Sequence, residues 1–491
     1  MTVSAALLLI TLDNSVLYTA LPTLMRELGA SSREGLWIIN AYPLVMAGLL
    51  LGAGTLGDRI GHRQMFLAGL GIFGVASVLA AYAPSVNLLI AARALLAVGA
   101  AVMMPATLAL IRITFEDERE RNMAIAIWGG ISLVGLALGP IVAGVLLRHF
   151  WWGSVFLINV PVVVLALILG FVVTPRSQAD ASKPWDLFSS FLVLLTLSGL
   201  VVAIKEAAYT APVWPILGAA CATVAVAGWL FTRRQARLAY PLLDFTIFRN
   251  PAFMAGVVAA VVAMFAMCSV QLTTTQRFQL VGGFSPLEAG LLVAALALGA
   301  LPIGLLGGAF LHKTGLRFLV AGGLTLAAAG VVLTSLSLHA DLIWIVASLG
   351  LTGAGLGATM SVAASAIMGN APAQRAGMAS SVEEVAFEFG SLLAVSLLGS
   401  LLTTLYSAGL ELPMGAPAAA RAGVAEALEL AARDPQGGAA LVAAATAAFD
   451  RSYLLSMYVI ASVLALGAVV TGWFLRSYGL GSSSFSDGAS A

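Results

Sequence analysis

The sequence has few charged residues and few cysteines, and both shortages restrict what the protein can be. Only 10% of its 491 residues are charged and 60% are hydrophobic, whereas a soluble chain carries about 25% charged residues. The two cysteines, Cys221 and Cys268, both lie in apolar runs, which favours isolated thiols over a disulfide or a metal pair. A net charge of +1 gives no indication of nucleic-acid binding. We therefore expect a polytopic membrane protein.

Signatures of catalysis are also lacking. The four histidines lie at scattered loop positions: His62, His149, His312 and His339. They have no metal-binding spacing with cysteine or glutamate, and no glycine-rich phosphate loop ending in lysine is present, which argues against an ATP-driven pump. We predict that the protein is not an enzyme and has no metal or organic cofactor.

Apolar runs long enough to cross a hydrocarbon core of about 30 Å recur along the whole chain. They predict an all-α fold of fourteen membrane-spanning helices, near residues 3–24, 36–57, 64–83, 87–112, 121–147, 153–174, 186–206, 213–232, 251–273, 286–311, 316–338, 342–368, 375–405 and 453–475. The first run has no basic region before it and contains Asp13 and Pro22, which argues against a cleaved signal peptide. Basic residues are nearly twice as frequent on the side that holds both termini, so both are expected to be cytoplasmic.

An internal repeat predicts how these helices are grouped. The segment Gly54–Arg63 resembles Gly308–Arg317, because their glycines and basic residues coincide at a separation of about 254 residues. A second match, at about 255 residues, aligns Met123, Gly135 and Gly144 with Met378, Gly390 and Gly399. Duplicated halves around a central site are typical of transporters that alternate between inward- and outward-open states.

The repeat predicts four regions. A six-helix bundle spans 1–175, two inserted helices with their linkers span 176–250, and a second six-helix bundle spans 251–476 before a cytoplasmic tail at 477–491. An extracellular segment at 407–451 is alanine-rich with scattered charges. It favours an amphipathic hairpin over the outer mouth, with a disordered loop as the alternative.

Three acidic residues lie within one membrane-spanning run: Glu383, Glu384 and Glu388. An ionised side chain at the bilayer centre costs about 2.5–3.5 kcal/mol or more, so such residues usually line an ion or substrate path. Glu384 and Glu388 share a helix face, whereas Glu383 points about 100° away from Glu384. A cation that enters between such carboxylates displaces a proton, which is the coupling that an antiporter requires.

Asp13 and Arg93 are isolated charges in two other predicted spans. An intramembrane guanidinium must be paired or hydrated, and Asp13 is the acid of the N-terminal half at a comparable depth. We predict that the two interact, directly or through water, and take part in proton coupling. The alternatives are that Arg93 reaches the membrane interface and that Asp13 makes a purely structural polar contact.

The loop after the second span is a candidate conformational latch. Asp58, Arg59, Gly61 and Arg63 place an acid and basic groups around a tight turn on the cytoplasmic face. Asp58 is expected to pair with an arginine or a helix end across the interface between the halves. The alternative is a solvated, positively charged loop.

Small residues in the fifth span form a candidate antiporter motif: Gly135, Gly139, Pro140 and Gly144. Small residues at four- and five-residue spacing allow helices to approach closely, and proline introduces a kink. The alternative is close packing without a gating role.

Five aromatic residues are candidates for stacking on flat organic cations: Trp37, Tyr42, Trp128, Phe387 and Phe389. Ordinary membrane packing is the alternative for each.

Together these motifs resemble the major facilitator superfamily, and within it the fourteen-helix drug:proton antiporters. The segments that carry the resemblance are Leu12–Pro22, Gly54–Arg63, Arg93–Gly99, Gly135–Gly144 and Trp152–Pro161. The Trp37–Tyr42 segment and the Glu383–Glu384 pair look closest to methyl viologen and quaternary ammonium exporters of bacteria. The resemblance extends over nearly the whole chain except 407–451.

The resemblance implies a monomeric exporter in the bacterial cytoplasmic membrane that uses the proton motive force. Its expected substrates are lipophilic cations such as quaternary ammonium antiseptics, dyes, viologens and bisbiguanides, which Asp13, Glu383, Glu384 and Glu388 would bind. Some relatives carry an acid in helix 10, where this chain has only Glu288 near the outer end. The alternative function is proton-coupled transport of a native metabolite, a lipid or a small nutrient.

Overall fold

In the residues that the computed structural model describes, every regular element is a helix. The described residues are 2–115, 117–174, 186–207, 212–238, 241–370, 376–434 and 437–478. Within these ranges, twelve helices are long and apolar enough to cross a membrane. Two further helices, α2 (Ser32–Ile60) and α5 (Glu118–His149), are 29 and 32 residues long. The chain is thus a multi-pass membrane protein.

The helices follow the predicted spans closely. The N-terminal group is α1 (Thr2–Leu28), α2, α3 (His62–Ala81), α4 (Val86–Thr114), α5, α6 (Ser154–Leu157) and α7 (Asn159–Val173). Next come α8 (Leu187–Ala207) and α9 (Trp214–Gln235). The C-terminal group is η1 (Phe245–Arg249), α10 (Pro251–Gln276), η2 (Arg277–Val281), α11 (Pro286–Thr314), α12 (Leu316–Leu336), α13 (Leu342–Gly369), α14 (Ala376–Leu393), η4 (Ala394–Leu398), α15 (Gly399–Gly409), η5 (Ala418–Ala422), α16 (Val424–Arg433) and α17 (Gly438–Phe474).

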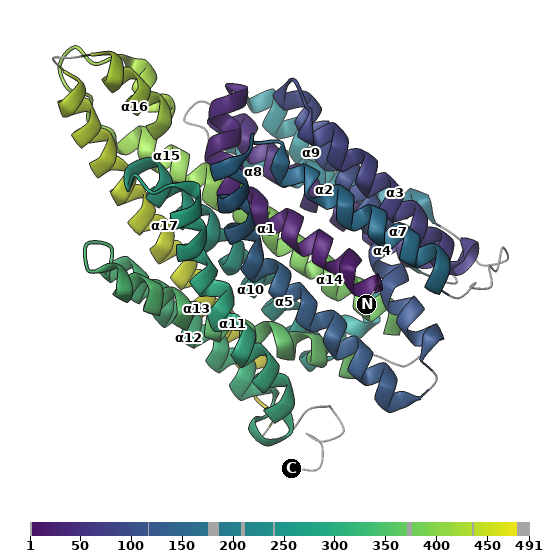
Figure 1. Ribbon diagram of the computed structural model, residues 1–491. Coiled ribbons are helices and arrows are strands. Elements are labelled where there is room, and N and C mark those ends of the chain that lie inside the picture. Colours follow the sequence, from purple (N-terminus) through teal and green to yellow (C-terminus); the bar gives the residue numbers. More distant parts are fainter. Residues whose placement is uncertain are drawn as a thin grey trace.

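The two groups lie side by side, as Figure 1 shows, with α1, α5, α10, α11 and α14 running through the middle of the view. The end that carries α16 and the turn between α1 and α2 is called the hairpin end below. The opposite end, where α1 begins, is called the termini end.

The repeat is visible where α2 and α11 begin. Ser31 and Glu34 form a capping box at the start of α2, in which each side chain accepts a hydrogen bond from the other residue's backbone N–H. Ser285 and Glu288 form the same capping box at the start of α11. Such a box satisfies two N–H groups that the first helical turn leaves unpaired. The Glu288 carboxylate therefore serves as a helix cap.

The repeat is equally visible where these helices end. Gly61 joins α2 to α3 with φ = 98°, and Gly315 joins α11 to α12 with φ = 80°. A side chain disfavours positive φ, so glycine is required at both joints. Each glycine N–H closes its helix by donating to the residue four positions earlier, Gly57 or Leu311.

The segment at 407–451 is largely helical. α16 packs on α17 through an apolar cluster that includes Val424, Ala427 and Leu441 and continues to Tyr406 of α15. α17 begins at Gly438, well before the predicted start at residue 453, so that boundary was wrong. Alanine has the highest helix propensity, and an alanine-rich stretch becomes helical once α16 covers one face. This favours the hairpin over a disordered loop.

α8 packs against α2 of the N-terminal group at two glycines. Gly48 and Gly52 of α2 face Leu194 and Ser190 of α8, and a Cβ on either glycine would lie less than 3.0 Å from the facing side chain. The same helix is joined to α9 by a bidentate ion pair, in which Arg234 donates to Asp186 over two distances of 3.0 Å.

Candidate functional site

Asp13 of α1 and Arg93 of α4 form a buried ion pair, in which the Arg93 Nη1 donates to the Asp13 Oδ2. Both side chains are 1% exposed. The predicted contact between the two charges is therefore confirmed, and it is direct. Arg93 does not reach the interface.

Asn159, which was not among the predicted site residues, completes this pair. Its Nδ2 donates to the Asp13 Oδ1 over 2.8 Å, and the same nitrogen lies 3.4 Å from the Ser77 Oγ. Asn159 is fully buried at the start of α7. An amide within the otherwise apolar run 153–174 was the available signal.

Arg93 has three further partners besides Asp13. Its Nε donates to the Ile38 carbonyl over 3.4 Å, its Nη2 donates to the Asn14 Oδ1 over 3.4 Å, and its guanidinium lies 4.7 Å from the Tyr42 ring centroid. A buried ion pair persists only if its remaining lone pairs and protons are satisfied. The pair thus ties α4 to α1, α2 and α7.

The three α14 acids are half-buried, in contrast to the Asp13–Arg93 pair. Glu384 is repelled by both Glu383 and Glu388. Glu388 also interacts electrostatically with Arg93, Tyr42 and Tyr18 of the N-terminal group. Among the three acids, Glu388 is therefore the one that faces the buried ion pair across the interface between the groups.

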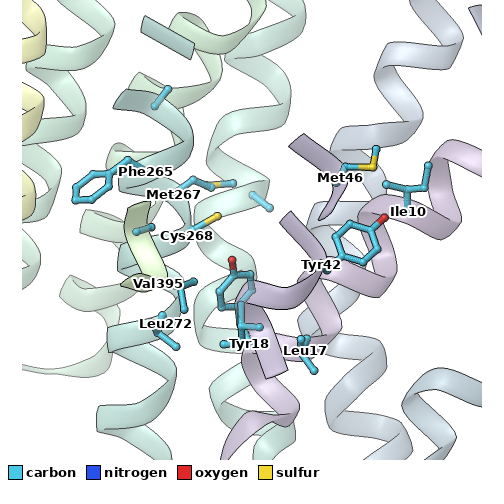
Figure 2. Close-up of a cluster of buried hydrophobic side chains, with 14 of the residues drawn as sticks. Ile10, Leu17, Tyr18, Tyr42, Met46, Phe265, Met267, Cys268, Leu272 and Val395 are labelled. Carbon is cyan, nitrogen blue, oxygen red and sulfur yellow. The ribbon is translucent and has the colours of Figure 1, made fainter. Parts of the chain in front are cut away.

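Hydrogen bonds join the two groups close to these charges. Tyr18 of α1 lies 3.3 Å from the Ser391 Oγ of α14, and the Asn40 Nδ2 of α2 donates to the Ser396 Oγ over 2.9 Å. Figure 2 shows Tyr18 beside Cys268 of α10, with Tyr42 on the side of the N-terminal group. Both cysteines are free thiols, Cys268 buried and Cys221 exposed.

α10 adds two more bonds across the same interface. The Gln271 Nε2 donates to the Ser15 Oγ over 3.1 Å, and the Gln279 Nε2 of η2 donates to the Thr19 carbonyl over 2.9 Å. These four hydrogen bonds between the N- and C-terminal groups lie at the middle of their helices or nearer the hairpin end. They hold the two groups together toward the hairpin end.

The glycines of α5 pack against helices of both groups. A Cβ on Gly135 or Gly139 would lie within 2.5 Å of Thr11 or Ser15 of α1. A Cβ on Gly144 would lie 2.3 Å from the Leu287 Cα of α11. One motif therefore holds α5 on its own group and against the other group.

The same pattern recurs in the C-terminal group. A Cβ on Gly390 of α14 would lie 2.4 Å from the Val261 carbonyl oxygen of α10, within the same group. A Cβ on Gly399 would lie 2.4 Å from the Leu36 side chain of α2, in the other group. Gly290 of α11 makes another close contact with the N-terminal group, because its Cβ would lie 2.2 Å from the carbonyl oxygen of Pro140 in α5.

The five candidate aromatic residues have different surroundings. Tyr42 is fully buried on Arg93, and the Trp128 indole N–H donates to the Thr107 Oγ1 over 3.1 Å. Trp37 and Phe389 pack in a small apolar cluster between α2, α8 and α14. Phe387 packs at the edge of the main core. Only Tyr42 thus contacts the buried charge pair.

The candidate latch is described in part. Arg59 is exposed, and the Arg63 Nη2 donates to the Phe171 carbonyl at the end of α7 over 2.7 Å. This bond lies within the N-terminal group. The Asp58 side chain lies outside the described residues, so its pairing across the interface stays a prediction.

Comparison with known proteins places the chain in a family. The model of the Major Facilitator Superfamily matches residues 3–281. The chain belongs to the Major Facilitator Superfamily. Within that superfamily it is 37% identical over 474 residues to the methyl viologen resistance protein SmvA of Salmonella typhimurium, covering 95% of each chain. It is 38% identical over 487 residues to the multidrug efflux pump LfrA of Mycolicibacterium smegmatis, covering 96% of this chain and 94% of that one.

The fold agrees with this membership. A bacterial homologue of the human lysosomal transporter Spinster, solved in an inward-facing and occupied conformation, superimposes with a TM-score of 0.66 at 17% identity. The match covers 97% of this chain and 96% of that one. The superfamily fold and the bacterial relatives identify the protein as a multi-pass transporter of the cytoplasmic membrane that is related to drug efflux proteins.

Proposed function

We propose that the protein is a proton-driven antiporter that exports lipophilic organic cations. Quaternary ammonium antiseptics, dyes, viologens and bisbiguanides are its proposed substrates, and the proton motive force is its proposed energy source. With α2 and α5 counted, the proposed topology has fourteen spans, both termini in the cytoplasm and the hairpin end outside. Binding would take place between the groups, in a monomer.

The observation that carries this proposal is the placement of Glu388. Its carboxylate interacts electrostatically with Arg93 across the interface, while Glu384 and Glu383 add two more negative charges on the same helix. Three neighbouring carboxylates repel one another, and either a bound proton or a bound organic cation relieves that repulsion. Competition between proton and cation for one site is what exchange transport needs.

The buried Asp13–Arg93 pair is the proposed second element of proton coupling. Protonation of Asp13 would weaken its bond to Arg93, which would then interact more strongly with the carboxylate of Glu388. Asn159 would keep the Asp13 carboxyl oriented in either state. Protonation of Asp13 and the charge state of Glu388 would thus be linked through the guanidinium of Arg93.

The contacts at the hairpin end support alternating access. The four hydrogen bonds named above and the close approach at Gly144 and Gly399 lie at the middle of the helices or at the hairpin end. With the proposed topology, this arrangement is closed to the outside, as in a state that receives substrate from the cytoplasm. Release would require these contacts to separate.

Transport by purified protein in liposomes tests the proposal. A pH gradient, acidic inside, should drive ethidium into liposomes in exchange for protons. Glu384→Gln and Glu388→Gln should each reduce the rate at least tenfold. Glu288→Gln is the matched control, because the Glu288 carboxylate caps α11 and glutamine can cap equally well.

Two outcomes would contradict the proposal. One is a pH gradient that drives no ethidium movement in the wild-type protein; the other is a Glu384→Gln variant with intact transport. Proton movement in the same direction as an added metabolite or nutrient would instead support symport.

A further inference from the structure

Lys205 of α8 is a buried cation that the proposed transport cycle does not use. Its side chain is 3% exposed, and its Nζ has no hydrogen-bond partner in the part of the chain described. The ammonium lies 4.1 Å from the ring centroid of Trp37 on α2. A charged side chain within a membrane-spanning helix is costly and usually marks a function. The ring alone leaves its three donors unsatisfied.

The charged neighbours of Lys205 leave a net positive charge at this place. The Glu206 carboxylate accepts hydrogen bonds from the Arg33 Nη2 over 3.2 Å and from the Val213 N–H over 2.7 Å. Arg33 and Glu206 carry opposite charges, so this pair does not balance the charge of Lys205. The Arg33 side chain is 57% exposed, so the group borders the surface.

A groove between α8 and α9 ends at Val202, within one helical turn of Lys205 and Glu206 along α8. It has a volume of about 440 Å³, which is within the range of ligand sites. Its walls are apolar or small, and they include Leu195, Val202, Ile216 and Ala219. Val202 is one helical turn from Glu206. The groove therefore runs along the helices from the charged group into the apolar part of the span.

Its position relative to the bilayer fits an amphiphile. Trp214 at the start of α9 is 72% exposed, and exposed tryptophans mark the membrane–water interface. The charged group is thus at headgroup depth, with the groove extending toward the bilayer centre. A net positive charge at headgroup depth above an apolar groove is complementary to an anionic lipid.

We propose that this groove is a binding site for an anionic phospholipid. One acyl chain would lie between α8 and α9, and the headgroup phosphate would accept hydrogen bonds from Arg33 and Lys205. Organic cations would be repelled from the site by the Lys205 ammonium, which has no hydrogen-bond partner in the part of the chain described. The lipid would fasten α8 and α9 to α2 of the N-terminal group, and this inference does not depend on the proposed transport activity.

Thermal unfolding of the purified, detergent-solubilised protein tests the site without any transport assay. Phosphatidylglycerol and phosphatidylcholine with identical acyl chains are each added to the same protein. Phosphatidylglycerol should raise the Tm by about 2–4 °C more than phosphatidylcholine, because a ligand that binds only the folded state stabilises it. Lys205→Met should abolish this difference.

Two matched pairs of variants make the outcome decisive. Arg476→Gln removes another basic residue stacked on a tryptophan, Trp473, and should leave the lipid effect unchanged. Ala219→Phe fills the groove on an exposed position and should abolish the effect, whereas Ala225→Phe, exposed on a different face of α9, should preserve it.

Three results would overturn the proposal. The first is equal stabilisation of the wild-type protein by both lipids. The second is an unchanged preference for phosphatidylglycerol in Lys205→Met and Ala219→Phe. The third is stabilisation by tetraphenylphosphonium that Ala219→Phe abolishes while the lipid effect remains, since the groove would then bind cations.

Discussion

A close backbone contact between the two groups, at Gly144, offers a direct test of how the hairpin end is closed. Gly144→Ala adds one methyl group to α5. That Cβ would lie 2.3 Å from the Cα and 2.8 Å from the backbone nitrogen of Leu287, whereas ordinary contacts are 3.4–4 Å. The neighbouring atoms belong to the backbone of α11 and cannot move aside as a side chain does. The two helices must separate by roughly 1 Å, because protein interiors have no spare volume.

The magnitude follows from the cost of overpacking. Forcing a methyl group into a filled interface costs about 1–3 kcal/mol. If the groups can separate at the hairpin end, the closed state alone bears this cost, and the ratio of open to closed molecules rises by about 5–150-fold. Gly290→Ala should act in the same direction, because its Cβ would lie 2.2 Å from the Pro140 carbonyl oxygen.

Native Cys268 reports the opening. It is buried, 6% exposed, and lies beside Tyr18 at the interface (Figure 2). In a Cys221→Ser background, a membrane-impermeant maleimide applied to whole cells should label Cys268 faster in Gly144→Ala than in the parent protein. Gly322→Ala is the control, since no atom lies within 4 Å of its added Cβ.

The reasoning would be refuted by unchanged labelling in a folded Gly144→Ala protein. Equal acceleration by Gly322→Ala would refute it too, because the effect would then come from helix substitution in general.

Three further predictions concern the ion pairs and the helix joint. Arg93→Met should destabilise the protein by about 3–5 kcal/mol, because it leaves Asp13 buried without its cation, and adding Asp13→Leu should restore much of this loss. Thermal unfolding of the wild type, the two single variants and the double variant measures the coupling between the residues. Additive losses of stability would contradict the ion pair. Gly61→Ala should lower the free energy of unfolding by about 1–2 kcal/mol, because φ is positive there. Gly71→Ala, whose added Cβ would lie in open space, should cause no measurable loss of stability in the same thermal melts. Burial raises the pKa of Asp186, but hydrogen bonds from Arg234 and Ser189 outweigh it and hold the pKa below its usual value. Asp186 therefore contributes stability above about pH 4, which is lost as the pH falls through the lowered pKa; melts between pH 3 and 7 should show a smaller loss in Arg234→Gln, and an equal loss would argue against the ion pair.

Much of the architecture could be predicted from the sequence because its determinants are local. A run of apolar residues fixes a membrane span by its length, and a glycine at a helix joint is required by the backbone alone. The start of α17 was the exception, since the alanine-rich stretch from Gly438 onward packs against α16 rather than forming an apolar run of its own. A hydropathy profile gives no information on that contact between helices.

The ion pair of Asp13 with Arg93 was also predictable, because a lone charge in a membrane span needs an opposite charge. Neutral polar residues give no such signal. Asn159 could not be chosen from the sequence as the partner of Asp13, since an amide in an apolar run has many possible partners. The position of Lys205 on Trp37 was not foreseen for a different reason, since a lysine at the end of a predicted span can reach the membrane surface.

Apolar runs, their internal repeat and the motifs are enough to predict an all-helical, duplicated membrane protein of the Major Facilitator Superfamily with acids in its spans. The partner of each acid depends on how the helices pack. Glu384 and Glu388 share a helix face, yet Glu388 interacts with Arg93, whereas Glu384 is repelled by its neighbours Glu383 and Glu388. Likewise, Gly135 and Gly144 belong to one motif, but one packs within its group and the other across the interface. Periodicity gives the direction of a side chain around its own helix, whereas its partner depends on where the other helices lie.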